Sequence, residues 1–193
     1  MDLSENAWDN RYLNNDIAWD LGEVSPPLKA YFDQLTNKEI KILIPGGGNS
    51  YEAAYLFEKG FENVWVVDLS KTAIANIQRS IPKFPPSQLI QGDFFDMEDS
   101  FDFIVEQTFF CAIDPSLRAD YVVKMNSLLK PKGTLVGVLF NAPLNKEKPP
   151  FGGNKAAYME QFKRFFEIQK MEACYNSFGN RKERELFIIL GKK

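Results

Sequence analysis

Histidine is absent from the 193-residue sequence. Its absence excludes nucleophilic sites built on an imidazole, zinc sites with histidine ligands and a histidine general base. Any catalysis must therefore rely on carboxylates, hydroxyls, the positioning of reactants or a cofactor, and we expect no metal site.

Cysteine and long apolar runs are also scarce. Cys111 and Cys174 are the only cysteines, too few for a disulfide framework and without a CxxC partner, so we expect free thiols in a reducing compartment. No run approaches the roughly 18 apolar residues of a membrane span. The start, Met1 to Glu5, lacks the basic and apolar regions of a signal peptide. We therefore expect a cytoplasmic protein without a membrane partner.

The charge balance is slightly acidic, with a net charge of -3. Lysine and arginine are scattered except for a C-terminal group, which we interpret as solvated charges of a turn and a tail: Arg181, Lys182, Arg184, Lys192 and Lys193. Because a nucleic-acid binder normally shows a basic stripe, we expect no nucleic-acid partner. The length fits one domain, which we expect to be monomeric and to act on a small molecule.

Short apolar runs alternate with helical patterns along the chain. We predict strands over residues 40–44, 64–67, 87–90, 101–105 and 134–140, and helices over 51–59, 71–81, 117–129 and 155–166. Two further runs, 167–175 and 185–190, flank an Asn/Gly turn and predict an antiparallel hairpin. The fold class is therefore α/β: a doubly wound, mostly parallel, seven-stranded sheet with a C-terminal antiparallel hairpin. Such a sheet is typical of methyltransferases that use S-adenosylmethionine (SAM).

A segment rich in aromatic residues, which we call the leader, precedes the first strand. Residues 1–27 contain Trp8, Tyr12 and Trp19 with acidic residues between them. The segment is either a helix packed on the core or a lid over a ligand, and its residues alone favour the packed helix.

A glycine-rich turn, residues 45–48, follows the first strand and precedes a helix. Gly46 and Gly48 allow a sharp bend and a ligand against the main chain. Asp68 ends the next strand, 20 residues after Gly48, where a carboxylate can accept hydrogen bonds from both ribose hydroxyls of an adenosine cofactor. The alternative is that Asp68 only caps the following helix.

Missing features distinguish between cofactors. The dinucleotide fingerprint needs a third glycine where this chain has Tyr51, which disfavours a nicotinamide cofactor. A neutral amino acid that bears a sulfonium needs no such anion cradle, and SAM fits. Asp93 is then placed to bond the adenine amino group and Phe94 to pack on its ring, and Gln107 ends the fourth strand.

These motifs resemble the thiopurine methyltransferase family, and within it the thiol, halide and thiocyanate methyltransferases. The resemblance covers most of the chain. The resemblance rests on the leader aromatics, the glycine turn, Asp68 and residues 92–95. The most specific motifs are the blocks at residues 101–104, 109–118, 128–133 and 149–151.

The resemblance implies a class I, Rossmann-like methyltransferase and changes the interpretation of the leader. Residues 1–27 become a lid and residues 40–193 the catalytic core of one domain. Aromatic faces suit a sulfonium because the ring quadrupole attracts cations. The implied cofactor-binding residues are Trp8, Tyr12, Trp19, Gly46, Gly48, Asp68, Leu69, Asp93, Phe94 and Gln107, and the implied catalytic residues near the acceptor are Arg118 and Gln107.

Two positions depart from the family pattern. Tyr12 stands where relatives often have Trp, and Gln107 where the halide and thiocyanate enzymes tend to have Tyr, so the acceptor stays open. Cys111 belongs to a family block, and we interpret it as a packing residue. The predicted activity is methyl transfer from SAM, with S-adenosylhomocysteine (SAH) as product, to a small soft nucleophile. The alternatives are a SAM-binding domain without catalysis and, less favoured, a nicotinamide-dependent oxidoreductase.

Overall fold

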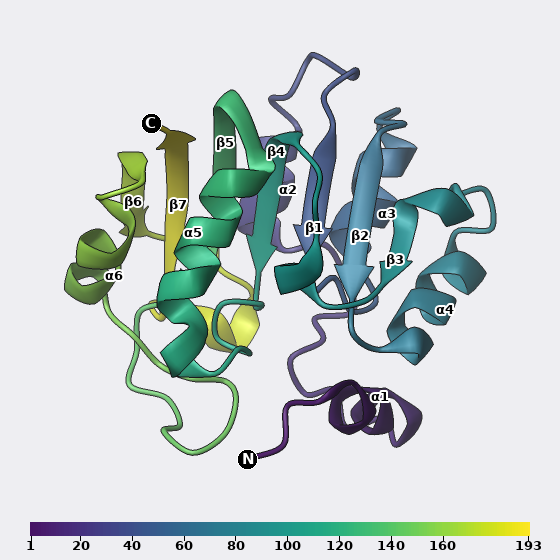
Figure 1. Ribbon diagram of the computed structural model, residues 1–193, viewed down its shortest axis with the longest axis horizontal. Coiled ribbons are helices and arrows are strands. Elements are labelled where there is room, and N and C mark those ends of the chain that lie inside the picture. The colour runs from purple at the N-terminus through teal and green to yellow at the C-terminus, as the bar shows by residue number, and fades with distance from the viewer.

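A computed structural model describes all residues, 1–193, around one sheet with the strand order β3-β2-β1-β4-β5-β7-β6. Neighbouring strands are parallel except for β7, which runs antiparallel to both β5 and β6. Figure 1 shows the reversed arrow of β7 at one side of the sheet. The strands are β1 Ile42–Pro45, β2 Val64–Asp68, β3 Leu89–Gln91, β4 Phe101–Gln107, β5 Leu129–Phe140, β6 Phe166–Ala173 and β7 Glu185–Lys192. The predicted fold class is confirmed.

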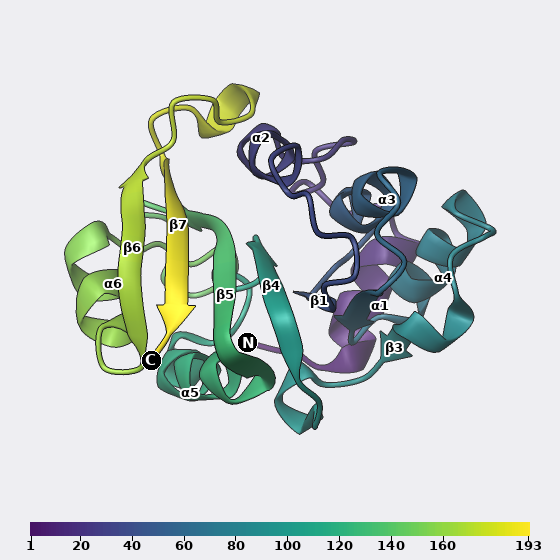
Figure 2. The same cartoon turned by 90° about the horizontal axis from the view of Figure 1, so that it is seen from above.

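Helices cover both faces of this sheet. Figure 2 shows α2 and α3 above one face and α5 below the other, with α4 near β3 and α6 beside β6. The helices are α1 Glu5–Leu13, α2 Pro26–Phe32, α3 Tyr51–Glu58, α4 Lys71–Ser80, α5 Arg118–Leu128 and α6 Lys155–Phe162. Short 3-10 turns are η1 Pro86–Gln88, η2 Phe94–Asp96, η3 Pro115–Leu117 and η4 Gly179–Arg181. No helix has the length and apolar character needed to cross a membrane.

The alternation of strand side chains divides the core into two layers. In β1, Ile42 and Ile44 pack into the layer with α2 and α3, whereas Leu43 between them packs into the layer with α5 and α6. Successive side chains of a strand point to opposite faces, so a strand covered on both faces reads as a continuous apolar run. This burial holds the carboxyl ends of the strands in fixed register.

The carboxyl ends of the parallel strands meet at one edge of the sheet, which lies at the bottom in Figure 1. Helix α1 lies across this edge beside β1, β2 and α4. Open α/β sheets bind ligands at this edge. The leader is thus a helix packed on the edge where the site was predicted.

The structure differs from the sequence-based expectation at three connections. Helix α2 starts at the proline pair that we took as the end of the leader, because Pro26 suits the first turn of a helix. Strand β5 begins at Leu129 rather than 134, through a register shift opposite Phe101. The predicted hairpin is antiparallel, but residues 174–184 join its strands through η4 instead of a tight turn.

Candidate functional site

The glycine turn after β1 lets two aromatic side chains approach the main chain. Gly46 and Gly48 have φ of 58° and 56°, a region that favours glycine. A Cβ on Gly46 would lie 2.3 Å from the ring of Phe109, and one on Gly48 would lie 2.7 Å from the hydroxyl of Tyr12. The space beside the glycine turn is therefore bounded on one side by the turn that follows β4 and on the other side by the leader.

Asp68 at the end of β2 connects this turn to helix α4. Its Oδ2 accepts the Gly48 N–H at 2.9 Å, and its Oδ1 accepts the Ser70 N–H at 2.8 Å. Burial raises the pKa of the carboxyl group. The N-cap of α4 is Ser70, whose hydroxyl accepts the Ala73 N–H at 3.1 Å. Asp68 therefore braces two turns, and each of its oxygens can accept one more hydrogen bond.

The predicted leader aromatics form one cluster around a cation. Trp19 makes edge contacts with Trp8 and Tyr12, with ring centroids 5.6 and 5.8 Å apart. The guanidinium of Arg11 lies 4.4 Å from the Trp19 ring centroid and 5.4 Å from that of Trp8. Burial, with the nearby charge of Asp68, raises the pKa of Tyr12 well above its usual value. The three aromatic residues predicted from the sequence thus lie together at the glycine turn.

Hydrogen bonds along its length fasten the leader to the core. The carboxylate of Asp9 accepts the Ser70 hydroxyl and the Thr72 N–H, each at 2.8 Å. Asn49 donates to Asp20 at 2.5 Å, and Arg181 donates to the Trp19 carbonyl at 2.6 Å. Farther along, the buried Glu52 accepts the N–H of Ser25 at 2.9 Å. These contacts hold the leader at both ends of its course over the edge.

The residues predicted to bind adenine, in the turn after β3, differ in their exposure to solvent. Asp93 is exposed and caps η2 by accepting the Phe95 N–H at 2.8 Å. Phe94 is buried and packs against Phe109 and Tyr121. Leu69, directly after Asp68, is half-buried. Their contacts with an adenine ring stay predictions.

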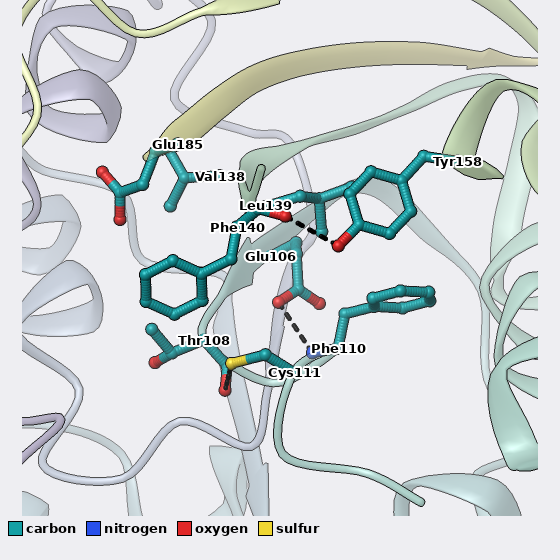
Figure 3. Close-up of a pocket in the computed structure, with 9 residues that line it drawn as sticks. All are labelled: Glu106, Thr108, Phe110, Cys111, Val138, Leu139, Phe140, Tyr158 and Glu185. Atoms are coloured by element: carbon teal, nitrogen blue, oxygen red, sulfur yellow. Dashed lines mark hydrogen bonds between the residues drawn. The ribbon is translucent and has the colours of Figure 1, made fainter. Parts of the chain in front are cut away.

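The end of β4 contains a fully buried carboxylate, that of Glu106. Its Oε1 accepts the N–H groups of Phe109 and Phe110, each at 2.9 Å, and its Oε2 accepts the hydroxyl of Tyr121. Burial raises the pKa of Glu106 to about 7. Figure 3 shows this side chain at the centre of a small cavity with Cys111 and Tyr158. The cavity of about 10 Å³ has room for one water molecule at most.

The two predicted acceptor residues each carry an unpaired buried atom. The Oε1 of Gln107 and the Nε of Arg118 have no hydrogen-bond partner. Arg118 is 9% exposed, lies 4.6 Å over the ring of Phe110 and donates to the Gly152 carbonyl at 3.1 Å. Buried polar atoms are normally satisfied. The unpaired atoms therefore mark this side of the site as suited to a polar ligand.

Arg181 corrects our interpretation of the C-terminal charges. It is 6% exposed and pairs with the buried Glu185 at 3.5 Å, whereas Lys182 and Arg184 are exposed as expected. Its burial depends on the leader, whose Trp19 carbonyl it binds. No local pattern predicts this contact because the partners are more than 150 residues apart.

Cys111 is a poor nucleophile in this setting. Its thiol is buried and donates to the Thr108 carbonyl at 3.3 Å. Burial, with the charge of Glu106, raises its pKa to about 12. Since the thiolate is the reactive form, the geometry agrees with the packing role predicted for this residue. Cys174 is likewise buried and free.

Comparison with known sequences agrees with this geometry. Residues 3–188 match the profile of the family described as thiopurine S-methyltransferase. A probable thiol methyltransferase 2 of Arabidopsis thaliana is 28% identical over 164 residues, which cover 81% of this chain and 72% of that protein. A thiopurine S-methyltransferase of Vibrio campbellii is 28% identical over 188 residues, covering 88% and 84%.

Solved structures share the fold. A TehB-like SAM-dependent methyltransferase from Corynebacterium glutamicum superposes with a TM-score of 0.70 at 18% identity, covering 98% of each chain. The 1,6-didemethyltoxoflavin-N1-methyltransferase of Burkholderia thailandensis, solved with its substrate and SAH, reaches a TM-score of 0.78 at 14% identity, covering 98% of this chain and 87% of that one. With the match over residues 3–188, the chain belongs to the thiopurine S-methyltransferase family and is a SAM-dependent methyltransferase.

Proposed function

We propose that this enzyme transfers the methyl group of SAM to a small, soft nucleophile: a thiol, a thiopurine-like compound, a halide or thiocyanate. The observation that carries the proposal is the half-buried carboxylate of Asp68, bonded to the Gly48 N–H at the ligand-binding edge of a chain that matches the family along its length. Residues 1–27 act as the lid over this edge, and residues 40–193 as the catalytic core.

The residues at the glycine turn fit the cofactor. Asp68 has lone pairs left for ribose hydroxyls. Gly48 adds no side chain of its own beside this carboxylate, and the Tyr12 hydroxyl lies next to it. The indole rings of Trp8 and Trp19 hold the guanidinium of Arg11, and the same ring quadrupole attracts a sulfonium. When bound, SAM supplies an electrophilic methyl group on positively charged sulfur.

We assign binding of the methyl acceptor to the C-terminal end of β4 and the N-terminal end of α5, where Gln107 and Arg118 lie. The unpaired Nε–H of Arg118 can donate a hydrogen bond to an anionic acceptor, whereas the unpaired Oε1 of Gln107 suits a group of the acceptor that carries a hydrogen. The guanidinium groups of Arg118 and the buried Arg181 favour an acceptor that carries negative charge, since both also lower the pKa of the nearby Cys111 thiol. These side chains would bind and orient an anion for in-line displacement, and alignment contributes several kcal/mol to such reactions.

The two most obvious candidates for a general base are missing or engaged. Histidine is absent, and the oxygens of Glu106 are engaged by Phe109, Phe110 and Tyr121. An acceptor that is already anionic needs no base. The leader contributes by excluding water, which favours a step in which opposite charges neutralise each other. An aromatic thiol meets these demands better than an alkyl thiol, which is only a few per cent ionised at neutral pH.

Two rival functions are separated by binding and turnover. A nicotinamide-dependent oxidoreductase would bind NADH rather than SAM, and a non-catalytic domain would bind SAM without turnover. Calorimetry with SAM, SAH and NADH tests the first. Incubation with labelled SAM and thiophenol, iodide, thiocyanate or a thiopurine tests the second, and SAM binding without methylation of any acceptor would contradict the proposed activity.

Asp68→Ala tests the cofactor site directly. Removing the carboxylate leaves ribose hydroxyls without a partner, which costs about 1–3 kcal/mol, or roughly 5- to 150-fold in SAH affinity. Asp96→Ala, an exposed aspartate at the same edge, is the matched control. Asp68→Asn keeps one oxygen for the Gly48 N–H and should lose less. Unchanged SAH affinity in folded Asp68→Ala would remove this residue from the site.

A further inference from the structure

The turn that follows β4 contains backbone strain close to the proposed acceptor side. Thr108 has φ of 57°, although a β-branched residue strongly disfavours the left-handed region. Such a conformation costs of order 1–3 kcal/mol and persists only where the surrounding structure enforces it. The contacts that enforce it here identify what controls the turn.

Glu106 provides those contacts from below the turn. Its Oε1 accepts both N–H groups that follow Thr108, those of Phe109 and Phe110, at 2.9 Å each. Its Oε2 accepts the hydroxyl of Tyr121 from helix α5. Figure 3 shows the carboxylate pointing from β4 toward Phe110. One fully buried side chain thus fixes the strained turn and attaches it to α5.

The turn in its strained shape reaches both halves of the site. The ring of Phe109 lies against the main chain at Gly46, on the cofactor side. The ring of Phe110 lies under the guanidinium of Arg118, on the acceptor side. The carbonyl of Cys111 accepts the Phe151 N–H at 2.7 Å and so fixes the long segment after β5. A change in the turn would displace all of these groups together.

We propose that Glu106 is the positioning residue that aligns acceptor with cofactor, by holding the strained turn of residues 108–111 in place through its carboxylate. The proposal rests on the proposed methyl transfer and adds a residue that acts through the turn, without contact with the reacting atoms.

The charge state of Glu106 is part of this mechanism. Only the ionised carboxylate accepts all three hydrogen bonds, and burial places its pKa at about 7. Protonation therefore exchanges an acceptor for a donor at the strained turn, and alignment is lost toward lower pH. The other titratable or charged groups around the same cavity and turn are Cys111, Arg118, Tyr121, Tyr158, Arg181 and Glu185.

The test compares wild type with Glu106→Gln in methylation of thiophenol between pH 5.5 and 8.5. At pH 8 we expect kcat/KM for thiophenol to fall about tenfold in Glu106→Gln, because the amide group cannot meet all three donors. The ratio of wild type to variant at each pH cancels the ionisation of thiophenol itself. This ratio should decline toward unity as pH falls through 7. SAH affinity should change less than about threefold, since Asp68 and the leader are untouched.

A second substitution distinguishes positioning from a general structural role. Thr108→Gly removes the strain, because glycine adopts a positive φ without cost. Glu106→Gln should therefore cost about tenfold in the Thr108 background and only about twofold in the Thr108→Gly background. Glu98→Gln, an exposed glutamate before β4, is the control and should match wild type. If Glu106→Gln does not fold, Tyr121→Phe removes one bond to the carboxylate and should shift the acid limb of the profile to higher pH.

A pH-independent ratio near one would overturn the proposal, as would an equal effect of Glu106→Gln in both Thr108 backgrounds. For Tyr121→Phe, an unshifted acid limb would do the same. Failure of the proposed function looks different. In that case wild type itself neither binds SAH nor methylates thiophenol, iodide or thiocyanate.

Discussion

Asp9 is the only buried residue of helix α1, and its replacement should free this helix while leaving the core folded. The helix buries little apolar surface, because its aromatic side chains, Trp8 and Tyr12, are only half-buried. Asp9 alone joins its middle to the N-terminus of α4, through bonds of 2.8 Å from Ser70 and Thr72. Glu5, at the exposed start of α1, also accepts a hydrogen bond of 2.7 Å from Gln91. The remaining leader contacts lie at Trp19, Asp20, Ser25 and Pro26. Asp9→Ala is therefore a local perturbation.

The expected magnitude follows from the two bonds. Hydrogen bonds to a charged group contribute about 1.5–3 kcal/mol each, and part of this is recovered by water when α1 opens. A net loss of about 3 kcal/mol lowers the equilibrium constant for docking by roughly 150-fold. Asp9→Asn keeps a neutral oxygen for both donors and should lose about a third of this, about 1 kcal/mol.

Native-state hydrogen exchange followed by mass spectrometry measures this opening. Protection of the amides in α1 should fall by roughly 100-fold in Asp9→Ala, while protection in β1 and β4 stays unchanged. Trypsin cleavage after Arg11 should accelerate in parallel. Asn6→Ala, an exposed position in the same helix, should behave as wild type. Protection of α1 within threefold of wild type would refute the assignment of Asp9 as the attachment of this helix.

The consequence for ligands is kinetic. Asp9 stabilises the docked helix both with and without cofactor, so SAH affinity changes little as long as the docked state remains dominant. If residues 1–27 are a lid, SAH can leave only after α1 opens, and its dissociation rate should rise together with the opening constant. Stopped-flow release of SAH measures that rate. Unchanged release despite faster amide exchange would show that the cofactor leaves by another route.

Two further predictions follow from the site. The pKa of Glu106 is raised from 4.5 to about 7, so the folded state favours the proton. This stabilisation of about 3 kcal/mol is complete below pH 4.5 and is lost as pH rises through 7. Urea unfolding at pH 5 and 8.5 should therefore show a smaller loss of stability in Glu106→Gln than in wild type, and equal losses would contradict the pKa. Gly48→Ala should weaken SAH binding at least tenfold more than Gly22→Ala. Both glycines have a positive φ, but only a Cβ at position 48 would meet a neighbour, the Tyr12 hydroxyl. Equal effects of the two substitutions on SAH binding would exclude steric contact as the cause.

Local patterns predicted the sheet well. Each of the seven predicted strands is present. In the central strands β1 and β4, two-sided burial leaves continuous apolar runs that are visible in sequence. The glycine turn and Asp68 were predictable for a related reason. Their relation is set by one β-α-β unit, whose geometry fixes the spacing of 20 residues.

The residues that sequence reasoning missed act across distant segments. Asp9 belongs to a helix whose apolar face is small, formed by Trp8 and Tyr12, and its partners lie at the start of α4. Arg181 stands among exposed charges but is buried by the leader. Periodicity reports which face of an element is buried, not which polar side chain finds a partner 60 or more residues away. A neighbouring aromatic residue, such as Trp8 before Asp9, is the one local sign that a charged residue is buried. Many exposed charged residues have such neighbours too.

Glu106 shows why the site includes groups that oppose stability. Above pH 7 its ionised form costs the fold about 3 kcal/mol through burial, and Thr108 adds strained backbone beside it. A neutral, unstrained turn would make the enzyme more stable. The carboxylate nevertheless links β4, the turn and α5 through three hydrogen bonds, which no neutral side chain of this size can accept. Proteins retain such costs at sites where alignment matters more than stability, and the same trade explains why methyl transfer is expected to improve over the pH range in which the fold weakens.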